Sequence, residues 1–151
     1  KKVFVMIILS KVSESLQELM DERGLNQLSL AEKLNTGRTK LSDILNANNA
    51  PNYNTLIRLV EFFNCSADFL LGLKDYPCEE VEYKPVVPFG ERLKAIMQER
   101  NISQGTLVEE TGISWSILHG WLKGKTSPSM DNLVKIAAYF DCSVDTMLGR
   151  V

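Results

Sequence analysis

The fold is decided by residues 103–128, SQGTLVEETGISWSILHGWLKGKTSP, and by their counterpart at residues 26–51, NQLSLAEKLNTGRTKLSDILNANNAP. Each stretch contains two short runs of apolar residues at helical spacing, separated by a turn that contains glycine. A proline closes each stretch. The pattern predicts two short helices joined by a tight turn. We expect these helices to begin after the N-cap residues Asn26 and Gly37 in the first stretch and Ser103 and Ser114 in the second.

The similarity extends over most of the 151 residues. When residues 13–74 are aligned without a gap with residues 90–151, an offset of 77, 18 of the 62 positions are identical. A period this long indicates a duplicated domain rather than a solenoid repeat. Each copy is predicted to form five short helices, so the expected fold class is all-α. Helix one is expected to bury Val12, Leu16, Leu19 and Met20 or Phe89, Leu93, Ile96 and Met97, and helix four Leu56, Leu59, Val60 and Phe63 or Leu133, Ile136, Ala137 and Phe140.

Outside the repeat, the N-terminal run Val3–Leu9 is apolar but far shorter than the ~20 residues of a membrane helix. Its β-branched and aromatic residues predict a short strand, which could pair with Glu80–Val87. The alternative is a tail that is ordered by packing. The expected organisation is a strand or tail at 1–11, a first domain at 12–74, an acidic linker with prolines at 75–88 and a second domain at 89–151.

The composition excludes several classes of protein. Apolar residues make up 44% and charged residues 24%, as in ordinary globular chains, which excludes a disordered or fibrous protein. One histidine and three cysteines without CxxC spacing argue against a metal site and a disulfide framework, and favour a reducing cytoplasm. No phosphate-binding loop or catalytic constellation is found, so we expect no enzyme and no cofactor. We also expect Cys65 and Cys142 to be buried and Cys78, in the linker, to be exposed.

The two predicted helices and their turn, framed by a longer helix on each side, closely resemble the Cro and phage-repressor type of helix-turn-helix, also called xenobiotic-response-element regulators. The resemblance covers about 62 residues in each half of the chain. It implies two tandem five-helix lambda-repressor-like domains. It also implies that the partner is double-stranded DNA, bound in a sequence-specific manner by a transcriptional regulator, more specifically a repressor.

The resemblance further implies roles for individual residues. The glutamine that opens helix two would reach a phosphate, helix three would enter the major groove, and the loop after it would touch the DNA backbone. In the first copy these residues are Gln27, Arg38, Thr39, Lys40, Ser42, Asp43, Asn46, Asn48 and Asn49. In the second copy they are Gln104, Trp115, Ser116, Ile117, His119, Gly120, Lys123, Lys125 and Thr126.

The sequence leaves alternatives open for the role of Trp115, for the function and for the oligomeric state. Trp115 could stack on a sugar or a thymine methyl group, bind a protein, or pack against its own domain. A protein-interaction module, antitoxin-like or anti-repressor, is the second functional hypothesis, because the net charge of −2 is unusual for a DNA-binding chain. The two copies could form an internal pseudo-dimer, or each could meet its counterpart in a homodimer.

Overall fold

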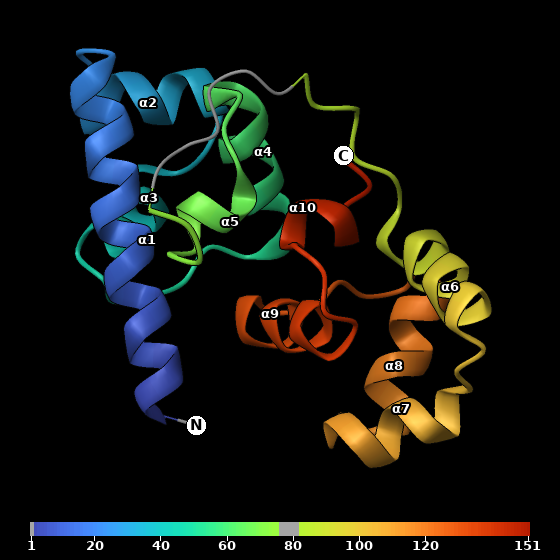
Figure 1. Cartoon of the computed structure of the whole chain (residues 1–151). Coiled ribbons are helices and arrows are strands. Elements are labelled where there is room, and N and C mark those ends of the chain that lie inside the picture. Colours follow the sequence, from blue (N-terminus) through green and yellow to red (C-terminus); the bar gives the residue numbers. More distant parts are fainter. Residues whose placement is uncertain (1, 76–81) are drawn as a thin grey trace. The chain divides into compact units, whose positions relative to one another are not determined.

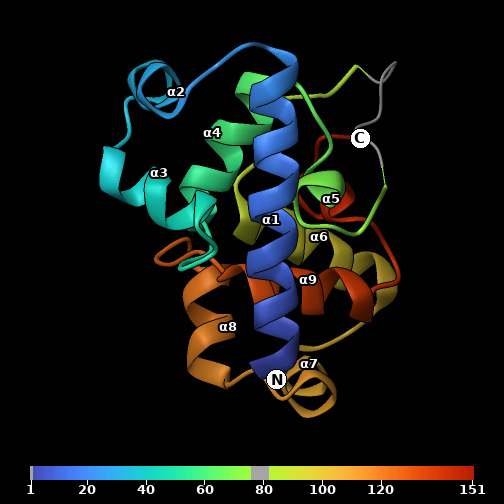
Figure 2. The same ribbon diagram turned by 90° about the vertical axis from the view of Figure 1, so that its left-hand side faces the viewer.

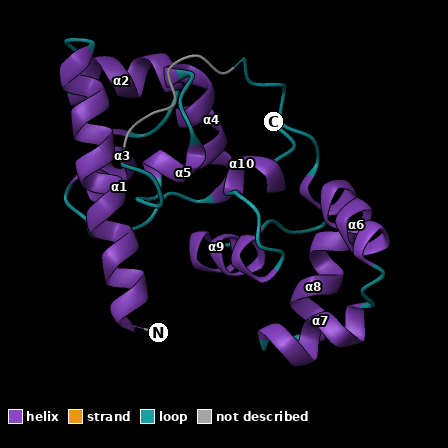
Figure 3. Ribbon diagram, viewed as in Figure 1, coloured by secondary structure: helices purple, strands orange, loops and turns teal. Residues whose placement is uncertain are grey.

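A computed structural model describes residues 2–75 and 82–151, with side chains from Met6 onward, and in these residues it contains ten helices and no strand (Figures 1 and 3). The described residues divide into unit 1, up to Asp75, and unit 2, from Glu82. The predicted all-α class is confirmed. Unit 1 contains α1 (Lys2–Glu22), α2 (Gln27–Leu34), α3 (Arg38–Leu45), α4 (Tyr53–Phe63) and α5 (Ala67–Leu70). Unit 2 contains α6 (Phe89–Arg100), α7 (Gln104–Thr111), α8 (Trp115–Leu122), α9 (Met130–Tyr139) and α10 (Val144–Met147).

The helices of the two units pack in the same pattern. In unit 1, α1 lies against α3 and α5, α2 lies against α3 and α4, and α4 lies against α5 (Figure 2). In unit 2, α6 lies against α8 and α10, α7 against α8 and α9, and α9 against α10. The repeat seen in the sequence is therefore a repeat of tertiary structure.

The helix starts agree with the predicted caps. Asn26 accepts a hydrogen bond from the backbone N–H of Ser29 at 2.8 Å, and Ser103 accepts one from that of Thr106 at 3.1 Å. Such caps satisfy backbone donors that the first helical turn leaves without a partner. The turn after α2 places Asn35 in the left-handed conformation with φ of 53°, and the equivalent Gly112 has φ of 74°. Asparagine thus serves in unit 1 where unit 2 uses glycine.

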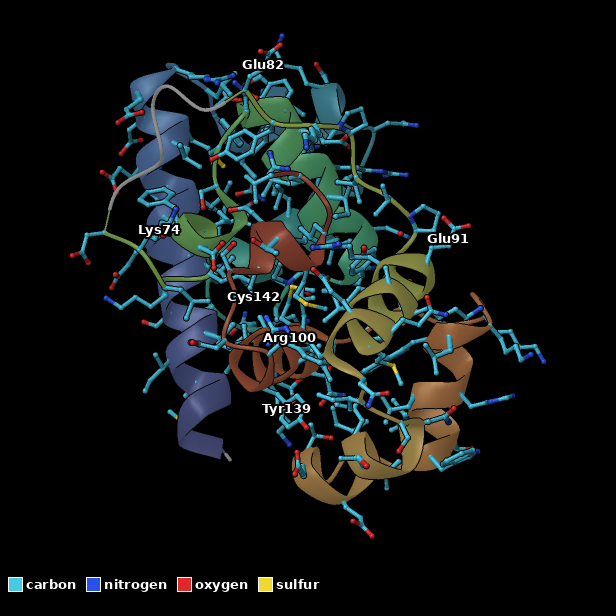
Figure 4. The ribbon with its side chains drawn as sticks, turned by 45° about the vertical axis from the view of Figure 1, so that its right-hand side comes forward. Lys74, Glu82, Glu91, Arg100, Tyr139 and Cys142 are labelled. Atoms are coloured by element: carbon cyan, nitrogen blue, oxygen red, sulfur yellow. The ribbon has the colours of Figure 1, made fainter. Side chains whose placement is uncertain are left out.

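The predicted core positions are buried in both units. All sixteen apolar residues expected on the inner faces of helices one and four are at most 9% exposed. Cys65 is also buried, as expected, but the expectation for Cys142 was wrong. Cys142 is only half-buried, because it lies in the loop between α9 and α10 (Figure 4). Cys78 lies outside the described residues.

The expected N-terminal strand is wrong. Residues 3–9 belong to α1, which begins at Lys2 and continues through the predicted first helix to Glu22. Extending an existing helix adds one hydrogen bond for each residue that is ordered, whereas a lone strand has no partner to bond with. Ile8 joins the buried face of α1, while Met6 and Ile7 remain exposed.

Part of the expected linker packs on unit 2 instead of pairing with residues 3–9. The backbone N–H of Lys84 donates to the carbonyl of Arg150 at 2.8 Å, and that of Val87 donates to Leu148 at 3.2 Å. The guanidinium of Arg150 also lies 4.0 Å from the centre of the Tyr83 ring. Residues 82–88 are therefore held against the end of unit 2, and the remaining linker residues 76–81 lie outside the described structure.

Candidate nucleic-acid interface

In both units a glutamine joins the second helix to the start of the third. Gln27 Nε2 donates to the carbonyl of Arg38 at 3.3 Å, and Gln104 Nε2 donates to the carbonyl of Trp115 at 3.4 Å. Each bond links the first residue of one helix to the first residue of the next. The side-chain amide nitrogen of glutamine carries two N–H groups, so one of them can still donate to a phosphate, as the predicted contact requires.

The third helix of unit 1 presents polar side chains from its first turn. Leu41 and Ile44 are buried, which turns the opposite side of α3 outward. On that side Arg38, Thr39 and Lys40 are exposed. The structure thus places three of the predicted base-contacting residues together on the accessible part of α3, next to the positive end of the helix dipole.

Two further predicted residues of α3 are engaged with the loop that follows. Ser42 Oγ accepts a bond from the Asn46 side chain at 3.2 Å, and Asp43 Oδ2 accepts one from Asn49 at 3.4 Å. The carbonyl of Asp43 also accepts the backbone N–H of Asn48 at 2.8 Å. Ser42 and Asp43 are half-buried, so the structure gives them a part in shaping the loop.

A depression of about 640 Å³ lies beside the start of α3. Its lining includes the predicted residues Thr39, Lys40 and Asp43, together with Asn49 and Asn52. Asn52 was missed by the sequence interpretation as a lining residue, although its position after the loop proline marks it as a cap. Its side chain accepts the N–H of Thr55 at 2.8 Å and so starts α4.

The third helix of unit 2 presents a different surface at the same positions. With the offset of 77, Arg38 corresponds to Trp115 and Lys40 to Ile117. Trp115 is 55% exposed and Ile117 is 44% exposed, so a large part of each side chain is accessible to a partner. Ser116 and His119 are exposed beside them. Two cations in unit 1 are thus replaced by two large apolar side chains in unit 2.

The loop after the third helix has the same backbone in both units. The backbone N–H of Lys125 donates to the carbonyl of Gly120 at 2.9 Å, as that of Asn48 does to Asp43. The chain turns through a left-handed residue, Ala47 with φ of 59° or Gly124 with φ of 72°. Here unit 2 carries the cations, since the exposed Lys123 and Lys125 stand where unit 1 has Asn46 and Asn48.

Thr126 closes this loop in unit 2. Its backbone N–H donates to the carbonyl of Gly120 at 3.3 Å. A Cβ atom added to Gly120 would lie 2.6 Å from Thr126 Oγ1, so the hydroxyl occupies the space that a side chain at position 120 would need. The loop therefore holds its two lysines on a backbone of defined conformation.

Neither a metal site nor a membrane-spanning helix is found in the described residues. The described residues contain no group of three or more His, Cys, Asp or Glu side chains that could hold a metal ion. None of the helices in the described ranges is long and apolar enough to cross a membrane. The hydroxyl of Tyr139 donates to Glu110, and this bond raises the pKa of the tyrosine. The pair joins α7 to α9 on the surface.

Comparison with known proteins agrees with this geometry. Residues 92–151 match the model of the Cro/C1-type helix-turn-helix DNA-binding domain, and residues 16–70 match a second helix-turn-helix model. Similar proteins include the HTH-type transcriptional regulator ImmR of Bacillus subtilis, 36% identical over 40% of this chain and 48% of its own length. The phage CTXphi transcriptional repressor RstR of Vibrio cholerae is 37% identical over 40% of this chain and 54% of its own. The transcriptional activator BcrR of Enterococcus faecalis is 30% identical over 40% of this chain and 30% of its own.

The matched region thus spans about a third to a half of the length of these relatives. No solved structure matches the chain. The expected resemblance is confirmed in both halves, and with it the DNA-binding, repressor-like character of the domains. The chain carries two helix-turn-helix domains of the Cro/C1 type, at residues 16–70 and 92–151.

Proposed function

We propose that the chain is a sequence-specific repressor that binds double-stranded DNA with α3 and α8, each placed in a major groove. The observation that supports this most strongly is the shared construction of the two sites. In both, a glutamine bonds the start of the third helix, and the outer face of that helix is exposed. A helix held in this way can meet base edges without being reordered on binding, which lowers the entropic cost of association.

The two sites distribute their charge differently. Unit 1 carries Arg38 and Lys40 at the start of α3, where an arginine can donate two hydrogen bonds to guanine. Unit 2 carries Lys123 and Lys125 in the loop after α8, where they would contact phosphates. We infer that unit 1 supplies most of the discrimination by hydrogen bonds, while the lysines of unit 2 mainly position the protein on the DNA backbone.

The test is selection of bound duplexes from a random library by the full chain, followed by a reporter gene placed behind the selected site. We expect one enriched sequence and lower expression of the reporter when the protein is present. An enriched site with raised expression would make the protein an activator. Failure to enrich any sequence, even at low salt, would contradict the proposal.

A second candidate function is a protein-interaction module on the same fold. The exposed Trp115 and Ile117 favour it, because aromatic residues are enriched in protein interfaces. In that case no duplex would be enriched, and the variant Trp115→Ala would lose a protein partner instead of a DNA sequence.

A further inference from the structure

We propose that unit 2 recognises thymine through its C5-methyl group, with Trp115 and Ile117 as the contacting side chains. This inference rests on the proposed function, since it names what α8 reads once the chain is bound to DNA. The two side chains lie within the first turn of α8 and are the large apolar residues of that helix that stay in water. The other apolar residues of α8 are buried or half-buried: Leu118, Trp121 and Leu122.

The register with unit 1 places this apolar pair at the reading positions. Trp115 and Ile117 stand where unit 1 has Arg38 and Lys40. The backbone of Trp115 is held by Gln104 as that of Arg38 is held by Gln27. The same helical frame that presents hydrogen-bond donors in unit 1 therefore presents hydrocarbon and aromatic surface in unit 2.

The charge around the pair favours DNA over a protein as the occupant. Lys123 and Lys125 are exposed in the loop after α8, at one end of the apolar pair, where they can bind phosphate groups at the edge of a groove. Carboxylates are absent from α8 and from the loop up to Ser129, a segment that lies wholly within the described residues. This surface matches a major groove of DNA. Its apolar residues would face the bases on the floor of the groove, and its cations would face the phosphates at the edge.

Thymine is the base that this surface can distinguish. Among the four bases it alone places a methyl group in the major groove. The remaining exposed side chains of the reading turns, Ser116 and His119, can each form a hydrogen bond, but neither has the two-pronged geometry that arginine offers to guanine or asparagine and glutamine offer to adenine. Selectivity in unit 2 therefore comes mainly from burying methyl groups against Trp115 and Ile117.

The experiment compares the selected duplex with the same duplex in which deoxyuridine replaces every thymidine. This replacement removes the methyl groups and keeps every hydrogen-bonding group of the base. We expect the full chain to bind the uracil duplex about four-fold more weakly for each methyl group that is buried against the protein, from ~0.8 kcal/mol per buried carbon group.

Variants of Trp115 test whether α8 causes the lower affinity for the uracil duplex. In Trp115→Ala the difference between the two duplexes should shrink by at least about four-fold, whereas Trp115→Phe should retain most of it. Trp115 is more than half exposed and bonds Gln104 through its backbone, so these variants should remain folded. Arg38→Ala should bind both duplexes more weakly and leave their ratio unchanged, because its contact does not involve the methyl group.

A complementary duplex adds methyl groups instead of removing them. In this duplex, C·G pairs first replace the T·A pairs whose methyl groups contribute to binding, and 5-methylcytosine then replaces those cytosines. The added methyl groups should raise the affinity of the wild type about four-fold each, and should not raise that of Trp115→Ala. Equal affinity for the thymine and uracil duplexes, or an equal loss in wild type and Trp115→Ala, would overturn the inference while the proposed function stands. Absence of binding to any thymine duplex would instead overturn the proposed function.

Discussion

Arg150 Nη1 donates to Asp145 Oδ1 at 2.6 Å, and both side chains are at most 4% exposed. This ion pair connects the last turn of unit 2 to the start of α10, and the same guanidinium lies over the ring of Tyr83. Unit 1 has Asp68 at the position of Asp145 but Leu73 at the position of Arg150. The combination of an aspartate and an arginine at these two positions is thus particular to unit 2.

Removing Arg150 should destabilise the protein strongly. Arg150→Met leaves the Asp145 carboxylate buried without its cation, which costs about 3–5 kcal/mol of unfolding free energy. Leu73→Met is the matched control, because that equivalent side chain is 49% exposed and should change stability by less than ~0.5 kcal/mol. Denaturant unfolding of both variants measures the difference, and equal midpoints would show that the pair contributes little.

The loop after the third helix should respond oppositely to exchanges in the two units. Ala47 adopts a left-handed conformation that costs a non-glycine residue ~1–2 kcal/mol, whereas the equivalent Gly124 adopts it without a Cβ atom. Ala47→Gly should therefore stabilise unit 1 by about 1 kcal/mol, and Gly124→Ala should destabilise unit 2 by a similar amount. Thermal unfolding tests both, and the same sign of change in both variants would contradict the assignment.

Cations in the two sites should affect DNA binding in different ways. Arg38→Ala should cost ~1–3 kcal/mol of binding free energy on the selected sequence and relax the sequence preference. Lys125→Ala should weaken binding to all sequences alike and reduce the salt slope by about one.

Arg58→Ala and Lys135→Ala provide controls for these two variants. They are exposed cations at equivalent positions on α4 and α9, away from the third helices in the packing pattern, and should leave affinity nearly unchanged. If Lys125→Ala altered the preferred sequence and Arg38→Ala did not, the roles of the two units would be reversed.

The salt dependence of binding should be moderate. Arg38, Lys40, Lys123 and Lys125 would neutralise about 4 phosphates, and one or two N-terminal lysines would raise this to about 5–6. At about −0.9 per phosphate, the logarithm of affinity should fall with the logarithm of salt concentration with a slope of roughly −4 to −5. Titration of the selected duplex at several salt concentrations measures this slope. An affinity that does not depend on salt would be inconsistent with phosphate contacts by these residues.

Alkaline pH should destabilise unit 1 through Tyr53. Burial raises the pKa of Tyr53 to about 12, above the value of ~10 expected in the unfolded chain. A folded-state pKa that is raised contributes stability below pH ~10, and this contribution is lost as the pH rises from ~10 towards 12. Tyr53→Phe should make the fall in unfolding free energy over this range shallower. Denaturant unfolding of the wild type and of Tyr53→Phe between pH ~8 and ~12 measures this difference.

Much of the fold followed from local patterns in the sequence. The offset of 77 predicted that the two halves share one structure, and the second, third and fifth helices have the same bounds in both after this shift. These helices were predictable because N-caps such as Asn26 and Ser103, and apolar residues at helical spacing, act over only a few residues. The same register by itself assigns Arg38 and Trp115 to equivalent positions at the start of the third helix.

The sequence could not settle features that depend on distant partners. The run 3–9 is compatible with a strand or a helix when only its composition is considered, and its continuity with the packed part of α1 decided the outcome. Arg150 has a charged side chain that would be expected in water, yet contacts with Asp145 and Tyr83 bury it. The exposure of Trp115 likewise depended on how α8 packs against α6 and α7, because burial is decided by the neighbours that the folded chain brings together.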